Sequence, residues 1–426
     1  MVDTIFAVSS GTAPAAIAIV RISGLMALAA AKRLCGEIPP PRRAALRALR
    51  GADGLLLDRA IVLVFPGPAT ATGEDLVELH IHGGRATIRA VESALAEFPG
   101  LRQAEPGEFT RRALFHGRID LTGAEGLGEL LIAETETQRR AAVSISEGGL
   151  RRRIERWNDQ LVQAAAQVEA ALDFSDEDDV PEDVAAHLSA AIARMCDELA
   201  VVSSAPAIER LRDGVRVVIA GPPNSGKSSL INRLADRDVA IVSPQAGTTR
   251  DRVEAPIMRA GVAYVLTDTA GLHDATDAVE RIGIDRAREA IMASDILLWL
   301  DDATPPVDNA VWLHARCDEL SRRALPVGPT LAISSISGEG IPALWEILAE
   351  RAGEIGALPN GIAVNARQRA LISDAEIALR DGASQNDMVL LAEAIRVARH
   401  AFDALTGRAD VESVLDALFG QFCIGK

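Results

Sequence analysis

Apolar and polar positions change their period several times along the chain, and each change indicates a different kind of structure. Residues 15–24 and 60–67 are apolar runs that end in turns, and residues 75–84 alternate apolar and polar side chains before two glycines. All three patterns are typical of strands. Residues 85–98 repeat apolar side chains at helical spacing and stop before a proline, which predicts an amphipathic helix. Residues 1–118 are therefore expected to form an α/β domain.

The helical period dominates two later stretches of the chain. Residues 119–212 carry apolar side chains three or four positions apart, with a break expected at Gly148 and Gly149. Residues 357–426 repeat the pattern. Because a domain insertion is tolerated at surface sites, the economical interpretation is one all-α domain interrupted by residues 213–356.

The interrupting segment alternates strand and helix signals. Continuous apolar runs, typical of buried parallel strands, occupy residues 215–221, 262–269, 295–301 and 330–335. Helical patterns follow the first and the last of these runs. About nine residues separate 295–301 from the apolar run 311–314, fewer than the dozen that a parallel crossover usually needs. We therefore expect the helix of that crossover to be shortened or lost.

Composition narrows the function classes. The 426 residues include 44 Lys and Arg against 60 Asp and Glu, a formal net charge of −16, so a nucleic-acid partner must meet local basic patches. Aromatic residues make up only 3%, too few for extensive base-stacking platforms. No apolar run reaches the length of a membrane span, and the N-terminus lacks the basic start of a secretory signal. Four widely spaced cysteines argue against a CxxC zinc site and favour a reducing cytosol.

Residues 221–228, GPPNSGKS, fit the phosphate-binding pattern GxxxxGK[ST]. The segment follows a predicted strand and opens a predicted helix, which is the context that a P-loop requires. Its glycines allow backbone N–H groups to approach phosphate oxygens at a helix N-terminus. Lys227 supplies a charge to the β- and γ-phosphates, and the Ser228 hydroxyl can ligate Mg²⁺.

Two further motifs follow in the order of a nucleotide switch. Asp268 to Gly271, DTAG, stand at a strand end and offer a carboxylate behind Mg²⁺ and a glycine amide near the γ-phosphate. Between them and the P-loop lies AGTTRD, residues 246–251. A threonine hydroxyl there can ligate Mg²⁺ only while the γ-phosphate holds the loop.

The base-reading motif departs from the NKxD of GTPases. The expected position reads Ala315-Arg316-Cys317-Asp318, so the guanine-reading Asp318 stands without its Asn and Lys neighbours. Arg316 could stack on the base through its planar guanidinium. Ser334 and Ser335 replace the usual SAK loop. The alternative is a degraded base pocket in which Asp318 only caps a helix.

Across nearly its whole length the chain resembles the MnmE (TrmE) family of tRNA-modification GTPases. The resemblance rests on DTIFAVSSG at the start, GEDLVELHIHGG at 73–84, EPGEFTRRAL at 105–114, the three nucleotide motifs and the final FCIGK. It implies an N-terminal tetrahydrofolate-binding domain (1–118) that dimerises, a helical domain (119–212 and 357–426) and an inserted Ras-like G domain (213–356). It also implies a cytoplasmic GTP-hydrolysing enzyme, without a membrane partner, that works with an FAD-dependent MnmG-type subunit. Such a complex adds a carboxymethylaminomethyl-type group to C5 of the wobble uridine of tRNA, using a tetrahydrofolate one-carbon unit in the 5-formyl or methylene form.

The same resemblance implies the site residues. For folate they are Arg21, Glu78, Arg118 and Lys426, with Arg118 standing where the family usually has Lys. Potassium is expected at Asn224, Ser243, Gln245 and Thr248, and Mg²⁺ at Ser228 and Thr249. Glu280 matches the acidic residue that orients water. The full set expected around GTP or GDP is Asn224, Ser225, Gly226, Lys227, Ser228, Ser229, Ser243, Thr248, Thr249, Asp268, Thr269, Ala270, Gly271, Asp318, Ser334 and Ser335.

Other residues keep two interpretations. Cys423 is either a nucleophile or carrier, because thiolates are strong nucleophiles, or a free cysteine in a packed tail. The pairs Arg111-Arg112 and Arg139-Arg140, and the triplet 151–153, either meet tRNA phosphates or are solvated helix faces. His80 and His82 share a strand face, but metal binding needs a third ligand, which favours a structural role.

Three functions compete at this level. The leading hypothesis is the GTP-hydrolysing subunit of a tRNA-modifying complex, with Lys227, Glu280 and Cys423 as its catalytic residues. The main alternative is a folate-binding dimeric scaffold whose weakened G domain binds guanine nucleotide poorly. A ribosome-assembly GTPase is the third, and the N-terminal and CIGK motifs argue against it.

Overall fold

The computed structural model describes residues 3–173, 182–204, 208, 213–235, 254–268, 288–355, 363–385, 387–409, 412–420 and 422–425. The chain divides into two compact units. Met1–Leu131, Ile145–Val180 and Asp387–Lys426 form the first, and Ile132–Ser144 and Pro181–Asn386 form the second. No helix among the described residues is long and apolar enough to cross a membrane.

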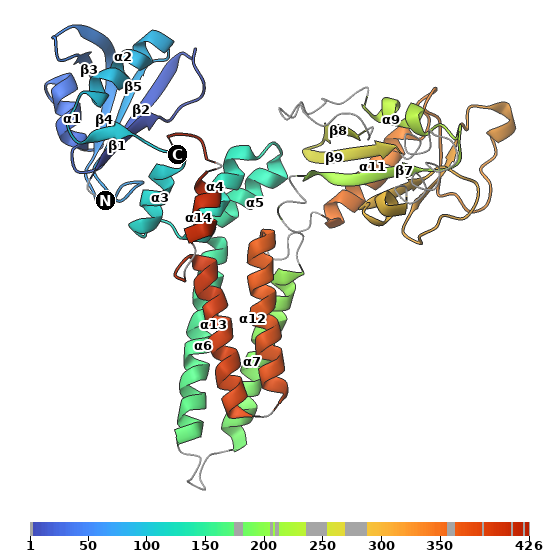
Figure 1. The fold of residues 1–426 in the computed structure, drawn as a ribbon. Helices are drawn as coiled ribbons and strands as arrows, with labels where there is room; N and C mark the ends of the chain where they lie inside the picture. The colour runs from blue at the N-terminus through green and yellow to red at the C-terminus, as the bar shows by residue number, and fades with distance from the viewer. Residues whose placement is uncertain are drawn as a thin grey trace, which may run out of the picture. The chain divides into compact units, whose positions relative to one another are not determined.

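The first unit begins with a six-stranded sheet in the order β3-β4-β5-β2-β1-β6 (Figure 1). Its three long apolar segments form β2, β4 and β5, as predicted. Helices α1 and α2 bury one face of the sheet in a shared apolar core. The elements are β1 (Thr4–Val8), β2 (Ile17–Ser23), α1 (Ala27–Cys35), β3 (Ala45–Arg50), β4 (Leu56–Phe65), β5 (Leu76–His82), α2 (Arg85–Ala96), β6 (Leu101–Gln103) and α3 (Glu108–Phe115).

Long helices complete both units. In the first, α6 packs along α13, where the rings of Trp157 and Phe402 stack with centroids 5.8 Å apart. In the second, α7 packs along α12. The predicted break at Gly148 and Gly149 is confirmed, since α5 ends at Ser146 and α6 begins at Gly149. These helices are α4 (Leu121–Ile132), α5 (Glu136–Ser146), α6 (Gly149–Asp173), α7 (Glu182–Ser203), α12 (Ala366–Ser384), α13 (Met388–Thr406) and α14 (Glu412–Phe419).

The second unit contains another six-stranded sheet, in the order β12-β11-β10-β7-β9-β8. Neighbouring strands are parallel except β8, which pairs antiparallel with β9 at the edge. This is the predicted α/β fold of the G domain. Its elements are β7 (Val215–Ala220), α9 (Lys227–Ala235), β8 (Glu254–Arg259), β9 (Val262–Asp268), β10 (Ile296–Trp299), β11 (Val311–Ala315), the 3-10 helix η2 (Leu320–Arg322), β12 (Leu331–Ile333) and α11 (Ile341–Ile355).

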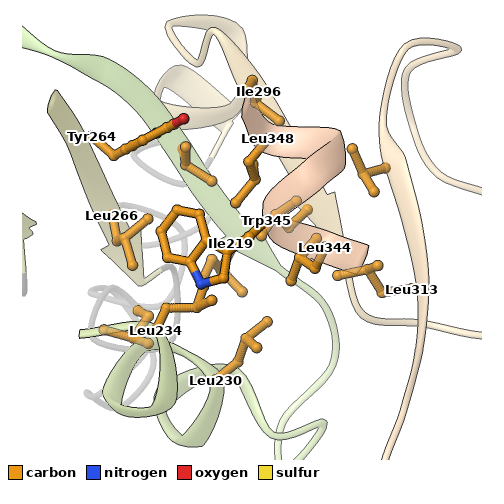
Figure 2. Close-up of a cluster of buried hydrophobic side chains, with 14 of the residues drawn as sticks. Ile219, Leu230, Leu234, Tyr264, Leu266, Ile296, Leu313, Leu344, Trp345 and Leu348 are labelled. Carbon is orange, nitrogen blue, oxygen red and sulfur yellow. The ribbon is translucent and has the colours of Figure 1, made fainter. Parts of the chain in front are cut away.

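One apolar core holds this sheet to α9 and α11. Figure 2 shows Trp345 of α11 among side chains of the central strands and of α9, with Tyr264 close to it. The Tyr264 and Trp345 rings meet edge to face, with centroids 5.4 Å apart. Because the core fixes the strands, it also fixes the loops that leave their carboxyl ends.

The crossover from β10 to β11 has lost its helix, as the short linker predicts. Residues 300–310 run as bends and turns throughout. Val307 and Ala310 nevertheless pack on the second face of the sheet, beside Val218 and Leu297. The loop therefore covers with two apolar side chains a surface that a helix normally covers.

A buried arginine ties the N-terminal domain together. Arg112 of α3 is 0% exposed, and its guanidinium donates hydrogen bonds to the Asp3 carboxylate, to Glu74 and to Glu108 at 3.0 to 3.1 Å. Arg102 of β6 bridges Asp3 and Glu108 from the other side, at 2.5 Å to each. A buried charge must be paired in this way, because an unpaired one is strongly destabilising. The network joins β1, β6, α3 and the loop that precedes β5.

The same network shifts two carboxyl groups. Burial by itself would raise the pKa of Glu108, but hydrogen bonds from Arg102 and from the backbone N–H of Glu105 outweigh it and hold the pKa below its usual value. For Asp3, burial is again outweighed, here by Arg102 and Arg112, and its pKa also lies below its usual value. Both groups stabilise the fold when they are ionised.

Arg112→Met should destabilise the N-terminal domain by about 3 to 5 kcal/mol, because three carboxylates lose their buried partner. Thermal melting with hydrogen exchange of the β1 and β6 amides measures the loss. Arg111→Met is the matched control: its partly exposed side chain makes one ion pair of 3.7 Å, with Asp416. Equal stability of Arg112→Met and Arg111→Met would contradict the role given to Arg112.

Since Asp3 and Glu108 have lowered pKa values, the stability of the wild-type protein should hold above about pH 4.5 and fall below it.

Candidate functional site

The carboxyl ends of the parallel strands gather the nucleotide motifs at one edge of the second sheet. The chain passes from β7 through β8 and β9 on one side, then crosses to β10 on the other. Ligands of open α/β sheets bind at such a switch point. The P-loop follows β7, Asp268 ends β9, and residues 315–318 and 334–335 follow β11 and β12.

The P-loop backbone adopts conformations that few residues tolerate. Gly221 has φ +153°, and a Cβ there would lie 2.7 Å from the Leu300 carbonyl oxygen. Asn224 has φ +60°, a left-handed conformation that Asn accepts better than most residues. These positions keep the loop narrow and leave its N–H groups open to an anion.

The polar side chains of the loop fit a bound phosphate. Lys227 is 4% exposed, and its ammonium donates to the carbonyl oxygens of Gly221 and Pro222 at 3.0 and 2.8 Å. Burial lowers the pKa of Lys227, and the charge of Asp268 acts in the opposite direction. Among the residues that the structure describes, the buried Ser225 hydroxyl has no hydrogen-bond partner. A phosphate would give Ser225 an acceptor and Lys227 an anionic one.

A hydroxyl and a carboxylate lie side by side next to the loop. The Ser228 hydroxyl donates to Asp268 Oδ2 at 2.7 Å. A hydroxyl and a carboxylate are the oxygen ligands that Mg²⁺ takes next to a nucleotide phosphate. Ser229 is exposed on the first turn of α9.

The base loop is ordered at residues 315–318. Ala315 is buried at the end of β11, and Arg316 has φ +60° with its Cγ about 4.0 Å from the position of a Cβ on Gly226. The Arg316 side chain therefore leans toward the P-loop. Asp318 is half-buried, and η2 has Glu319 at its N-cap with no side-chain cap bond, so Asp318 does not cap it.

The two serines after β12 differ. Ser334 is fully buried, and its hydroxyl accepts hydrogen bonds from the N–H groups of Ile336 and Ser337 at 3.2 and 3.0 Å. Ser334 therefore shapes its own turn. Ser335 is half-buried beside it.

Several predicted site residues lie outside the described residues. They are Ser243, Gln245, Thr248, Thr249, Thr269, Ala270, Gly271, Glu280 and Lys426.

A second pocket, of about 360 Å³, lies in the first unit. Arg21 of β2 and Arg118 both line it, with Phe109 and Thr110 of α3 and the loop at Thr72. The Arg21 guanidinium lies 5.8 Å from the Phe109 ring centroid and donates to Glu78 Oε1 at 2.8 Å. Arg118 Nε donates to the Thr70 carbonyl at 3.0 Å. Three of the four predicted folate residues thus belong to one region, with Glu78 bound to Arg21 across neighbouring strands.

The resemblance puts Arg21 and Lys426 at one folate site, which requires the C-terminal segment to reach back to the N-terminal domain, and residues 424 and 425 contact that domain. Ile424 forms a β-bridge with Pro106, and the Ser9 hydroxyl donates to the Gly425 carbonyl at 2.8 Å. Phe422 packs against Phe419 and Leu121 in an apolar cluster. Within this single chain, residues 424 and 425 contact the chain's own N-terminal domain. Cys423 is exposed.

One basic pair is corrected by the structure. Arg112 cannot meet tRNA phosphates, since it is fully buried and paired. Adjacent arginines look alike in sequence, and only the helix face separates the buried Arg112 from the partly exposed Arg111. Arg139 and Arg140 are exposed and Arg151 is half-buried, and all three form local ion pairs on their own helices. His80 and His82 each face a carboxylate, Glu78 at 3.5 Å and Asp58 at 2.7 Å.

Together these features define a P-loop nucleotide-binding protein that joins a Ras-like α/β domain to long helices and a separate N-terminal sheet. Two protein-family models match it. One, described as the MnmE helical domain, covers residues 121–423, and one, described as the GTP-binding protein TrmE N-terminus, covers residues 4–118.

Curated relatives agree over the full length. A protein of Erythrobacter litoralis named tRNA modification GTPase MnmE is 52% identical and covers 100% of both chains. Another of that name, from Rhizorhabdus wittichii, is 52% identical and covers 100% of this chain and 97% of its own. The chain belongs to the MnmE family of tRNA-modification GTPases. The prediction of a GTP-hydrolysing enzyme is thereby confirmed.

Gly221→Ala should abolish nucleotide binding, because its Cβ would press on the Leu300 carbonyl in a backbone conformation that alanine avoids. Titration with a fluorescent GDP analogue measures the loss. Gly353→Ala in α11 is the matched control, since a Cβ there meets nothing within 4 Å. Unchanged affinity of Gly221→Ala would refute the close approach.

Proposed function

We propose that the chain is the GTP-hydrolysing subunit of a tRNA-modification complex and that it uses a tetrahydrofolate one-carbon unit to build an aminomethyl-type group on C5 of wobble uridine. The observation that carries the GTP part is the buried Lys227 with its two carbonyl partners and the unpaired Ser225 hydroxyl. The folate part rests on the Arg21 and Arg118 pocket.

At the nucleotide site the residues divide the work. When phosphate enters, Lys227 exchanges its carbonyl partners for phosphate oxygens, and Ser225 gains an acceptor. Ser228 and Asp268, together with Thr249, would hold Mg²⁺, which would neutralise charge on the β- and γ-phosphates. Asp318 reads guanine, with Ser334 and Ser335 shaping the opposite loop, and we assign Thr269, Ala270 and Gly271 to the γ-phosphate.

Potassium completes the hydrolysis site in this proposal. Its ligands are Asn224, Ser243, Gln245 and Thr248, and Glu280 orients the attacking water. A cation there stabilises charge that develops in the transition state. The position of Asn224 in the left-handed bend of the P-loop, exposed at its tip, supports this role.

At the folate pocket, Arg21 and Arg118 differ in how many of their hydrogen-bond donors are already used. Arg21 is held by Glu78 and stacks near Phe109, while Arg118 is anchored through Nε and keeps its remaining donors. Carboxylates of a glutamyl tail suit such cations, because charge-assisted hydrogen bonds are strong. Glu78 offers a carboxylate to the amide and amino edge of a pterin. Lys426 follows the docked Gly425 and adds a third cation.

Exposed apolar side chains on the N-terminal sheet support a homodimer. Ile17, Leu46 and Ile61 lie on the face opposite α1 and α2 and are 58%, 62% and 43% exposed. Exposed apolar side chains gathered on one face favour a protein partner, and we assign this face to a second copy of the chain. An MnmG-type FAD-dependent subunit and tRNA complete the complex, which works in the cytoplasm.

The alternative scaffold function keeps one supporting observation. Ala315 offers no side-chain hydrogen bond where GTPases carry Asn, so a lower affinity for guanine nucleotide is expected. A scaffold would bind folate and dimerise without potassium-stimulated hydrolysis.

GTP hydrolysis should rise several-fold when potassium replaces sodium, and loss of the Asn224 carboxamide should remove the rise. Asn224→Gly is the sharper variant, since glycine accepts φ +60° without strain, and Asn224→Ala serves beside it. Single-turnover hydrolysis in matched potassium and sodium buffers gives the measurement. Equal rates in both salts would favour the scaffold alternative.

Gly425→Ala should weaken 5-formyltetrahydrofolate binding and impair tRNA modification, while GTP hydrolysis stays nearly unchanged. A Cβ at Gly425 would lie 2.3 Å from the Val8 carbonyl oxygen, which forces the C-terminal segment off the sheet. Calorimetry with 5-formyltetrahydrofolate measures the affinity, and removal of residues 423–426 should act in the same direction. Cys423→Ser separates the thiol from the docking: full folate affinity with lost modification would assign chemistry to Cys423. Identical folate affinities of wild type and Gly425→Ala would show that the segment only packs.

A further inference from the structure

The base loop at residues 315–318 is held firmly although its motif is incomplete. On one flank, the Cys317 N–H donates to the Ile333 carbonyl at 3.2 Å, which ties the loop to β12. On the other flank, Ala315 has only its backbone to offer, and its carbonyl accepts a hydrogen bond from Arg322 Nε at 2.9 Å. Arg322 therefore anchors position 315 through its backbone carbonyl, because the alanine side chain can form no hydrogen bond.

Arg322 is itself fixed by two residues from other segments. Its Nη2 donates to Asp302 Oδ1 at 2.9 Å and lies 3.2 Å from His314 Nδ1. His314 Nε2 lies 2.9 Å from the Arg322 backbone carbonyl, which can only accept, so Nε2 carries a hydrogen. His314 Nδ1 also lies 3.0 Å from Asp302 Oδ1. His314 is 3% exposed, so the cluster is closed on its inner side.

Asp302 reaches this cluster because the crossover after β10 runs without a helix. Indole N–H groups pin the loop on both sides of Asp302: Trp312 donates to the Asp301 carbonyl at 2.6 Å and Trp299 to the Ala303 carbonyl at 2.8 Å. Both anchoring rings belong to neighbouring parallel strands. The lost helix and the altered base motif are thus joined by direct contacts.

We propose that Asp302, His314 and Arg322 are positioning residues that hold the guanine-reading loop through the Ala315 carbonyl, in place of the side chain that the motif lacks. The inference rests on the proposed guanine site at Asp318. The side chains of Asp302 and His314 act through Arg322, whose guanidinium donates the hydrogen bond to the loop. The hydrogen bond from Arg322 lowers the pKa of Asp302. Burial acts in the opposite direction, and the contact with His314 lowers the pKa further.

The test compares GDP with ADP on the full-length chain. Arg322→Met should weaken binding of a fluorescent GDP analogue about tenfold, since a hydrogen bond from a charged donor to the loop is lost. ADP, measured by competition, should bind unchanged, because the phosphate site remains intact. Arg323→Met removes the same charge from the exposed neighbouring residue and should leave both affinities unchanged.

A second variant tests the order of action. Asp302→Asn should weaken GDP binding less than Arg322→Met, and the double variant should bind GDP no more weakly than Arg322→Met alone, because Asp302 acts only through Arg322. Additive losses would overturn that order.

Two other outcomes separate the hypotheses. An unchanged preference for GDP over ADP in Arg322→Met, or an equal loss of both nucleotides with a lower melting temperature, would overturn the positioning role alone. Equal affinities of wild type for GDP and ADP would overturn the guanine site itself, and this inference with it.

Discussion

Buried or half-buried cations with fixed partners organise the N-terminal domain, the P-loop and the base loop of this chain. Arg112 has three carboxylates in the N-terminal domain, Lys227 has two carbonyl oxygens in the P-loop, and Arg322 has Asp302 and the Ala315 carbonyl at the base loop. Desolvating a charge is expensive unless its partners are fixed. The cations therefore fix the positions of loops that no regular secondary structure holds. In the P-loop, Lys227 can exchange its carbonyl partners for phosphate oxygens, and this exchange distinguishes a ligand site from a structural network.

The central strands could be predicted because burial on both faces leaves a recognisable apolar pattern in their sequences. Strands covered on both faces are continuous apolar runs, so β7, β9 and β10 stood out in the sequence. Two edge strands, β3 and β8, were missed because they lack such a run, whereas the edge strand β12 was predicted. β8 is EAPIMR, with a proline and charged ends, and β3 is ALRALR, which shows no strict alternation. Edge strands are shaped by their single neighbour, which a local pattern does not record.

The candidate sites divide in a similar way. The P-loop and Asp268 follow from spacing, because phosphate chemistry requires particular residues at fixed intervals. The contacts of Asp302, His314 and Arg322 span up to 20 positions, match no motif and depend on the path of a loop without a helix. Arg111 and Arg112 show most clearly what a local pattern cannot predict. Of these two adjacent arginines, Arg112 is buried and Arg111 is partly exposed, because a helix turns by about 100° from one residue to the next.

The hydrogen bond between Ser9 and Gly425 closes a separation of 416 positions. Ribosomal synthesis is vectorial, and domains generally fold as they emerge. The strands of the N-terminal sheet are therefore available for folding long before Ile424 and Gly425 are synthesised. The contact of Ser9 with Gly425 is one of the last that the N-terminal domain can make, so the surface around Val8 and Ser9 is completed late in folding.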